Sequence, residues 1–208
     1  MSNEVKTKEK VNLDPKYLIK LTVTLFLTCC VVVAGLLGLV NSVTAGPIAD
    51  INKAKTEEAM KAVVADPDNS TFSDALALTE EMTAAALAGG GTLTEAYEVQ
   101  VGGATAGYAL KVIASGSQGS IEMMVGLDVD GVVTGVSVVK HAETAGIGTK
   151  VLDNEPNAAG VPFLDQFKGM SGSVEVGGNV TAITGATVSS KGVTAGVNTA
   201  LAVAGVLG

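Results

Sequence analysis

The stretch GYALKVIASGSQGSIEMMVGLDVDGVVTGVSVVK, residues 107–140, determines the fold of this 208-residue chain. It contains three runs rich in β-branched and apolar residues, at 107–115, 120–128 and 132–140, with glycine-bearing turns between them. A fourth run, YEVQV at 97–101, precedes them. Because short turns join antiparallel neighbours, the stretch predicts an antiparallel sheet.

The turn DVDG, residues 128–131, has alternating Asp128 and Asp130, which also occur in calcium-binding loops. Such a loop needs glycine at its sixth position and glutamate at its twelfth, and the chain offers neither there. We therefore interpret DVDG as a hairpin turn.

Helical patterns lie on both sides of the strand region. Residues 188–207 are rich in alanine and valine with few charges, which predicts a mostly buried closing helix. Residues 66–93 combine turn formers with a short apolar pattern and predict a helix between loops, whereas residues 48–66 resemble an exposed amphipathic helix. The expected fold class is α+β, with an antiparallel sheet flanked by helices.

The run LTVTLFLTCCVVVAGLLGLV, residues 21–40, contains no charge and no proline. At about 1.5 Å per residue it covers roughly the 30 Å hydrocarbon core of a bilayer. A cleaved signal peptide ending near VTAG, residues 43–46, is the alternative, although its apolar region is usually about 7–15 residues. The run predicts a retained transmembrane helix, in which Cys29 and Cys30 serve as small apolar groups.

The flanks of this run differ in charge. Residues 1–20 contain five lysines, and the opposite flank has no basic residue before Lys53. Cytoplasmic flanks collect lysine, so we expect a cytoplasmic amino terminus and an extracytoplasmic main domain at the cell membrane. The predicted domains are a cytoplasmic segment at 1–20, a transmembrane helix at 21–43, a juxtamembrane helical stalk and loop at 44–93, and a compact domain at 94–208.

Composition excludes several classes of function. The chain has 13 basic and 21 acidic residues, a formal net charge of −8, and every basic residue is lysine. Nucleic-acid binding is not expected, because phosphate-rich partners select dense basic surfaces and guanidinium contacts. The single histidine, His141, and two adjacent cysteines provide no zinc or iron–sulfur framework, so no metal site is predicted.

The stretch TAITGATVSS, residues 181–190, crowds hydroxyl groups just before the predicted closing helix. Helix capping by Ser189 or Ser190 is one interpretation, but capping needs only one such side chain. A helix start also presents unpaired amides and the positive end of its dipole. A phosphate beside residues 184–187 would therefore be stabilised, and the stretch predicts an anion site.

The stretch KHAETAGIGTK, residues 140–150, follows the last predicted strand. It can be a plain connection from strand to helix, with His141 as a hydrogen-bonding residue. Its glycines, Gly146 and Gly148, also allow the backbone to approach a planar or anionic ligand closely.

With these two motifs in this order, the chain resembles the covalent FMN-binding subunits of respiratory membrane complexes. These are the G subunit of Rnf and the C subunit of sodium-translocating NADH:quinone reductase. The resemblance covers nearly the whole chain: one amino-terminal span, an exported strand-rich domain, a loop similar to H-x-E-T-P-G-L-G, and S/T-G-A-T-x-S/T before a helix. The departures are Ala145 in place of proline, Ile147 in place of leucine and Thr181 in place of an aspartate.

The resemblance implies that Thr187 is esterified to the phosphate of FMN by a flavin transferase. The residues it implies for the phosphate and the helix entry are Thr184, Gly185, Ala186 and Ser190. The residues it implies near the flavin are Glu143, Thr144, Gly146, Ile147 and Gly148.

The resemblance also implies a function. An Rnf complex passes electrons between ferredoxin and NAD while moving sodium ions or protons, and this chain would be a relay among the other membrane subunits. Because the cofactor carries the redox chemistry, no catalytic acid–base pair is expected. The short chain favours Rnf over the quinone reductase; a free-standing extracytoplasmic flavin carrier and a flavin-free exported domain remain as alternatives.

Overall fold

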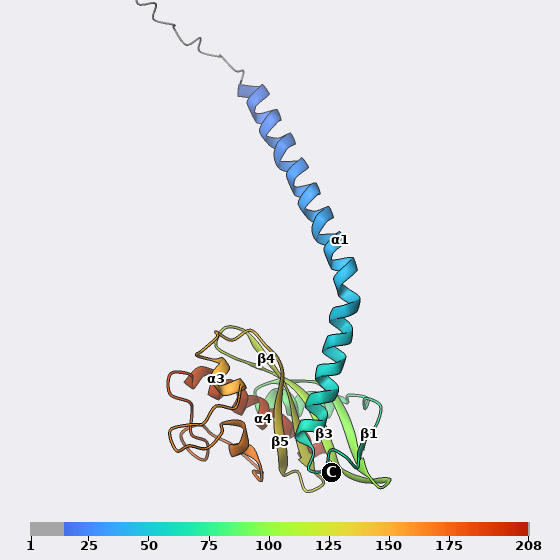
Figure 1. Cartoon of the computed structure of the whole chain (residues 1–208), viewed down its shortest axis with the longest axis vertical. Coiled ribbons are helices and arrows are strands. Elements are labelled where there is room, and N and C mark those ends of the chain that lie inside the picture. The colour runs from blue at the N-terminus through green and yellow to red at the C-terminus, as the bar shows by residue number, and fades with distance from the viewer. Residues whose placement is uncertain (1–14, 208) are drawn as a thin grey trace, which may run out of the picture. The chain divides into compact units, whose positions relative to one another are not determined.

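The computed structural model describes residues 15–207 and divides the chain into two units, one ending at Ile51 and one beginning at Asn52 (Figure 1). Most of the predicted cytoplasmic segment lies outside the described residues. The predicted boundaries at residues 43 and 93 stay predictions.

The helix α1 (Pro15–Val63) runs for 49 residues and contains Pro47 in its interior. Proline removes one backbone donor, yet the helix continues through it, so the predicted membrane helix and stalk helix are continuous. Apolar side chains such as Leu25 and Phe26 are exposed along its first part. Within residues 15–207 this is the one helix that is long and apolar enough to cross a membrane, which indicates membrane anchoring.

The second unit is built on a five-stranded sheet whose strands pair in chain order, each antiparallel to the next. The strands are β1 (Ser70–Phe72), β2 (Thr92–Val101), β3 (Ala104–Ser115), β4 (Ser120–Asp128) and β5 (Val133–His141). The four predicted strands are confirmed, although β2 begins earlier than expected. The strand β1 was not predicted, because three residues are too few for an alternating pattern to be recognised.

Both faces of the sheet are buried. Met123 and Met124 are neighbours in β4 and point to opposite faces, and both are 0% exposed. One face packs against α2 (Glu80–Gly89) and α4 (Thr187–Leu207), and the other against the last turns of α1 (Figure 1). The α+β class with a helix-flanked antiparallel sheet is therefore confirmed.

The end of α1 packs closely on strands β4 and β5. Gly126 and Gly135 are cross-strand partners, and a Cβ atom added at Gly135 would lie 2.9 Å from the Cα atom of Val63. The hydroxyl of Thr134 donates to the Val63 carbonyl oxygen at 2.5 Å. The sequence suggested an exposed stalk here, but the last turns of α1 belong to the core.

The helix α4 also approaches the sheet closely. A Cβ atom at Gly192 would lie 2.5 Å from the Ser115 carbonyl oxygen, and one at Gly196 would lie 2.6 Å from the Met123 sulfur. Ten residues of α4 are buried, as the sequence predicted for the closing helix. Small residues on this face set the distance between helix and sheet.

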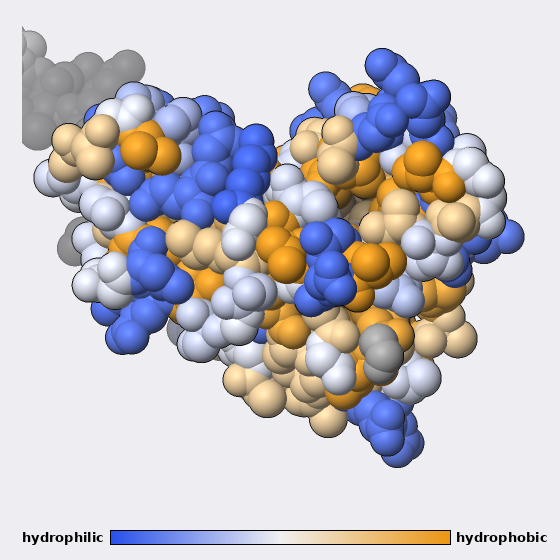
Figure 2. Space-filling model, turned by 90° about the horizontal axis from the view of Figure 1, so that it is seen from below, coloured by the Kyte–Doolittle hydropathy of each residue, from blue (hydrophilic) through white to orange (hydrophobic). Residues whose placement is uncertain are grey.

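The segment between β5 and α4 contains two short elements, α3 (Thr149–Leu152) and the 3₁₀-helix η1 (Leu164–Phe167). Phe163 and Phe167 are 0% exposed and meet edge to face, with ring centroids 5.5 Å apart. Seen from below, the surface mixes hydrophilic and hydrophobic residues (Figure 2). This face therefore has the mixed character of a water-exposed surface.

Candidate functional site

Three segments meet at a cavity of about 300 Å³. They are the β3–β4 turn, the loop after β5 and the first turn of α4. The pairing of Ile121 with His141 brings the first two together, because it places the start of β4 beside the end of β5. The lining residues are Ser117, Gln118, Glu143, Thr144, Ile147, Gly148, Gly185, Ala186, Thr187, Val188 and Ser189.

The helix α4 begins at Thr187, on the cavity wall. Gly185 has a φ of 82°, which is costly for other residues, and the amide of Ala186 donates to the Ile183 carbonyl at 3.0 Å. The amide of Ser190 then donates to the Ala186 carbonyl at 2.9 Å, as the first bond of the helical ladder. The amides of residues 187–189 precede it and can stabilise an anion.

Thr187 and Thr184 are both exposed, but only Thr187 lines the cavity. The prediction that Ser189 or Ser190 caps the helix is wrong, because α4 begins before both residues. Ser190 is buried, and its hydroxyl accepts from the Ile183 amide at 3.2 Å and donates to the Ala186 carbonyl at 3.0 Å. The hydroxyl of Ser189 instead donates to Glu143 Oε2 at 2.7 Å.

Glu143 is 8% exposed and accepts hydrogen bonds through both oxygens. Its Oε1 atom accepts from the amides of Ser117 at 2.6 Å and Gln118 at 3.1 Å. Burial by itself raises the pKa of this carboxyl, but the three hydrogen bonds and the nearby His141 outweigh burial and hold the pKa below its ordinary value. Glu143 is therefore a buried carboxylate at neutral pH.

The remaining predicted residues fall into two groups. Thr144, Ile147 and Gly148 line the cavity, and Ile147 is 54% exposed. Gly146 is not among the lining residues; it has a φ of 74°, and its amide donates to the Thr149 hydroxyl at 3.0 Å. Gly146 thus shapes the loop that carries Ile147.

Four lining residues were not singled out as site residues from the sequence: Ser117, Gln118, Val188 and Ser189. Ser189 belongs to the hydroxyl cluster at residues 181–190, but the sequence does not show that its side chain points toward Glu143. The turn GSQG that contains Ser117 and Gln118 was visible only as a connection between strands.

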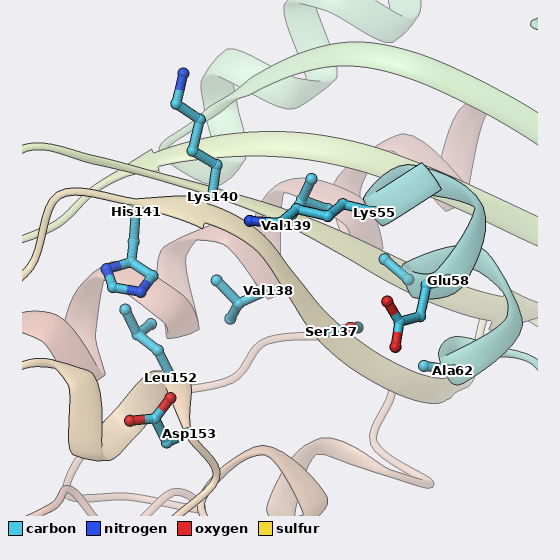
Figure 3. Close-up of a pocket in the computed structure, with 11 residues that line it drawn as sticks. Lys55, Glu58, Ala62, Ser137, Val138, Val139, Lys140, His141, Leu152 and Asp153 are labelled. Atoms are coloured by element: carbon cyan, nitrogen blue, oxygen red, sulfur yellow. The ribbon is translucent and has the colours of Figure 1, made fainter. Parts of the chain in front are cut away.

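A second cavity of about 450 Å³ lies between the end of α1, the strand β5 and Leu152 and Asp153 (Figure 3). His141 points toward Leu152 and Asp153 there, and Glu58 faces the space from α1 (Figure 3). This cavity is larger than the first, but its lining includes neither the amides of a helix start nor the residues of the hydroxyl cluster. Size alone therefore does not identify the functional site.

Comparison with known proteins gives two results. Residues 116–202 match the model of the FMN-binding domain family, and this range contains every segment that lines the first cavity. The G subunit of the Na⁺-translocating ferredoxin:NAD⁺ oxidoreductase complex of Acetobacterium woodii is 36% identical over 213 residues, which cover 96% of this chain and 97% of that protein.

Two other relatives are also named as G subunits. That of an ion-translocating oxidoreductase complex of Methanosarcina acetivorans is 30% identical, over 86% of this chain and 90% of its own. That of the proton-translocating ferredoxin:NAD⁺ oxidoreductase complex of Clostridium ljungdahlii is 35% identical over 50% of this chain and 57% of its own. The chain therefore belongs to the family of G subunits of ion-translocating ferredoxin:NAD⁺ oxidoreductase (Rnf) complexes.

Proposed function

We propose that the chain is the membrane-anchored flavoprotein subunit that relays electrons within an ion-translocating ferredoxin:NAD⁺ oxidoreductase, and that the phosphate of its FMN is esterified to Thr187. Family membership and the FMN-binding domain support the electron-transfer role. When bound, FMN supplies the one-electron and two-electron chemistry, whereas the protein fixes its position and surroundings.

The observation that carries the covalent link is the position of Thr187. Its side chain is exposed at the cavity, and it is the first residue of a helix whose leading amides precede the hydrogen-bonded ladder. A phosphate joined to the Thr187 oxygen would lie beside those amides and the positive end of the helix dipole.

The charges of the lining also favour an ester over a free phosphate. Among the described lining residues, Glu143 carries a carboxylate and none carries a cationic side chain. A free phosphate monoester carries a charge of about −1.5 to −2 at neutral pH, whereas a diester carries only one negative charge. Neutral amides suit the lower charge, and the covalent bond retains the cofactor without a cation.

Ester formation needs an activated donor. Joining free FMN to a hydroxyl would release water, which is unfavourable in aqueous solution. A flavin transferase acting on Thr187 would therefore use a flavin nucleotide whose phosphoanhydride bond breaks as the threonine oxygen bonds to phosphorus. The nucleoside monophosphate on the other side of the broken anhydride bond leaves, FMN stays joined to the protein, and the hydroxyl proton passes to a base of the transferase.

The other lining residues suit the non-covalent part of the cofactor. Ile147, in the loop after β5, is 54% exposed, and Val188, in the first turn of α4, is 58% exposed. Both side chains provide apolar contacts for a planar ring. Thr144 offers a hydroxyl to the ribityl chain, and Gly185, where an added Cβ atom would meet nothing within 4 Å, lets the cofactor approach the backbone; Gly148 makes room for Glu143 and Ser189 beside it. Gly146, Thr184, Ala186 and Ser190 maintain the loop and helix entry.

The lysine-rich amino end supports an orientation with that end in the cytoplasm and the FMN-binding domain on the outer side of the membrane. In this orientation a covalent tether prevents loss of the cofactor to the external medium. The other membrane subunits of the complex would be its electron-transfer partners.

The test uses the full-length chain expressed with its flavin transferase. The wild-type protein is expected to show flavin fluorescence in a denaturing gel and an added FMN mass in the intact chain. Thr187→Val removes the hydroxyl at nearly constant volume and is expected to abolish both signals. Thr83→Val, at an exposed threonine of α2 that does not line the cavity, is the matched control and retains them.

Fluorescence that persists in the denatured Thr187→Val chain would place the attachment elsewhere. A wild-type chain without added mass would contradict the covalent proposal, although FMN could still bind without a covalent bond.

A further inference from the structure

Both oxygens of the Glu143 carboxylate already accept hydrogen bonds from protein groups. Oε1 accepts two backbone amides, from Ser117 and Gln118, and Oε2 accepts the hydroxyl of Ser189. An anionic side chain would also repel a phosphate directly. Glu143 is therefore better suited to hold protein groups in place than to contact the cofactor.

These hydrogen bonds join segments that are distant in sequence. Glu143 lies 26 residues from Ser117 and 46 residues from Ser189 along the chain. One side chain thus connects the β3–β4 turn, the loop after β5 and the first turn of α4, which are the three walls of the cavity. Ser189 is two positions beyond Thr187, so a bond at Ser189 restrains the same helical turn.

Two glycines form a close socket around the carboxylate. A Cβ atom at Gly116 would overlap Glu143 Oε1, and one at Gly148 would overlap Oε2. Gly148 has a φ of −67° and a ψ of −32°, which an alanine also adopts, so its backbone conformation does not require glycine. A side chain at residue 148 is excluded by Glu143 and by the Ser189 hydroxyl, which would lie 2.9 Å from the added Cβ atom.

We propose that Glu143 is the positioning residue for Thr187: its buried carboxylate ties the β3–β4 turn to the first turn of α4 and thereby presents the Thr187 hydroxyl for flavin attachment. The inference rests on the proposed ester at Thr187. It assigns Glu143 a role that acts through Ser189 and requires no contact with the flavin.

The test measures the initial rate of flavin attachment to full-length apo protein in detergent, with purified transferase and its flavin nucleotide, over a range of protein concentrations. Glu143→Ala removes all three bonds, and Ser189→Ala removes only the bond to α4. Thermal unfolding of each variant is measured in parallel. Denaturing-gel fluorescence reports the product.

Both variants are expected to lower kcat by roughly tenfold to a hundredfold, because a small displacement of a reacting group can cost that much. KM should change by less than about threefold, since positioning by these residues does not require that they contact the transferase. Glu143→Gln is expected to restore most of the rate, because its amide can accept from both backbone amides and donate to the Ser189 hydroxyl.

Two control variants match the substitutions. Glu95→Gln changes a hydrogen-bonded glutamate on β2 that is not among the lining residues. Thr194→Val removes a buried hydroxyl of α4 that donates to the Ser190 carbonyl at 2.9 Å. Both are expected to load at the wild-type rate.

Gly148→Ala provides an independent variant. The added methyl group displaces the carboxylate without straining the backbone, so flavin attachment should slow although Glu143 and Ser189 are both present. Equal loading of Gly148→Ala and wild type would contradict the socket.

The inference is overturned if folded Ser189→Ala and Glu143→Ala proteins load at the wild-type rate. It is also overturned if their rates fall only by the fraction of unfolded protein, because Glu143 would then act on stability alone. If the wild type itself takes up no flavin, the proposed ester fails and this inference fails with it. If flavin attachment requires Thr187 but the Glu143 and Ser189 variants load at the wild-type rate, this inference is rejected and the proposed ester stands.

Discussion

Two helices of this chain have similar side chains and opposite surroundings. The first part of α1 and the whole of α4 are both rich in small and branched apolar residues, mainly leucine and valine in α1 and valine and alanine in α4. Leu25 and Phe26 in α1 are 64% and 68% exposed, whereas Val193 and Val197 in α4 are 0% exposed. Apolar composition by itself therefore does not tell a membrane anchor from a core helix.

One difference is that α4 also has polar side chains that bond outside the helix, although Thr194 and Thr199 bond within it. In α1, Thr24 and Thr28 donate to carbonyl oxygens four residues earlier in the same helix, at 2.8 Å. A helix in lipid must satisfy its polar groups in this internal way. In α4, Asn198 and Ser189 bond to residues outside the helix. Thus these polar groups of the first part of α1 are satisfied within the helix, whereas α4 depends on the sheet and loops around it.

The strongest test of this contrast is a matched pair of glycine substitutions. At Gly192 of α4, a side chain would meet the Ser115 carbonyl and the Cα atom of Gly116. Gly192→Val should reduce the free energy of unfolding of the compact unit by about 3 kcal/mol, as expected for severe overpacking. At Gly35 of α1 an added Cβ would contact no described atom within 4 Å, so Gly35→Val should leave this free energy unchanged.

The free energies can be measured by urea unfolding of the full-length chain in detergent, with near-ultraviolet circular dichroism as the signal. Equal effects of the two substitutions would show that α4 tolerates separation from the sheet, contrary to the close packing at Ser115.

A second, smaller effect is expected at Asn198. Its Nδ2 donates to the Val174 carbonyl at 2.8 Å, and its Oδ1 accepts from the Val174 amide at 2.9 Å. Val174 is 2% exposed, so Asn198→Leu leaves two buried backbone groups without these partners. We expect a loss of about 2 kcal/mol in the free energy of unfolding, because unsatisfied buried groups cost roughly 1–3 kcal/mol.

Asn41→Leu is the matched control for Asn198→Leu, because Asn41 is exposed on α1. It should not change the urea midpoint of the compact unit. A similar midpoint for Asn198→Leu and wild type would mean that Val174 finds other partners, and that α4 is less dependent on its surroundings than the structure indicates.

The elements that the sequence predicted correctly are those with long, regular patterns. Strands β3 to β5 and helix α4 repeat their apolar positions over many residues. The strand β1 and the short elements α3 and η1 exist because the rest of the fold holds them, so no local pattern marks them. Proline usually favours a helix end, yet α1 continues through Pro47, and no local pattern in the sequence indicates this continuity.

At the site, the sequence indicated residues whose side-chain type carries the chemistry, such as Thr187 and Glu143. It could not indicate Ser117 and Gln118, because Glu143 binds their backbone amides and every non-proline residue has an amide. The distinction between Ser189 and Ser190 was also out of reach. Neighbouring residues point about 100° apart around a helix, so their roles depend on which residue begins it.

The smallest expected effect is a dependence of α4 on pH that α1 does not share. The pKa of Glu143 is lower in the folded protein than its ordinary value, because its hydrogen bonds outweigh burial. A carboxyl with a depressed folded pKa contributes stability that is fully present above its unfolded pKa, about 4.3, and that is lost as pH falls through the folded pKa. Residues 21–49 of α1 contain no acidic or basic side chain, so the helix has no comparable dependence there.

Hydrogen-exchange protection of residues 190–193, whose amides lie in the first turn of the helical ladder, should therefore be constant from neutral pH to about pH 5, after correction for the intrinsic effect of pH, and fall below it. Glu143→Gln should remove this fall because it has no titrating carboxyl at this position. Glu95→Gln is the control. Burial raises the pKa of Glu95, but hydrogen bonds with Tyr97 and Lys111 outweigh burial and hold that pKa below its ordinary value, as at Glu143. Glu95, however, does not bond to α4. If Glu95→Gln removed the fall and Glu143→Gln preserved it, acid would act on α4 through the sheet rather than through the bond at Ser189.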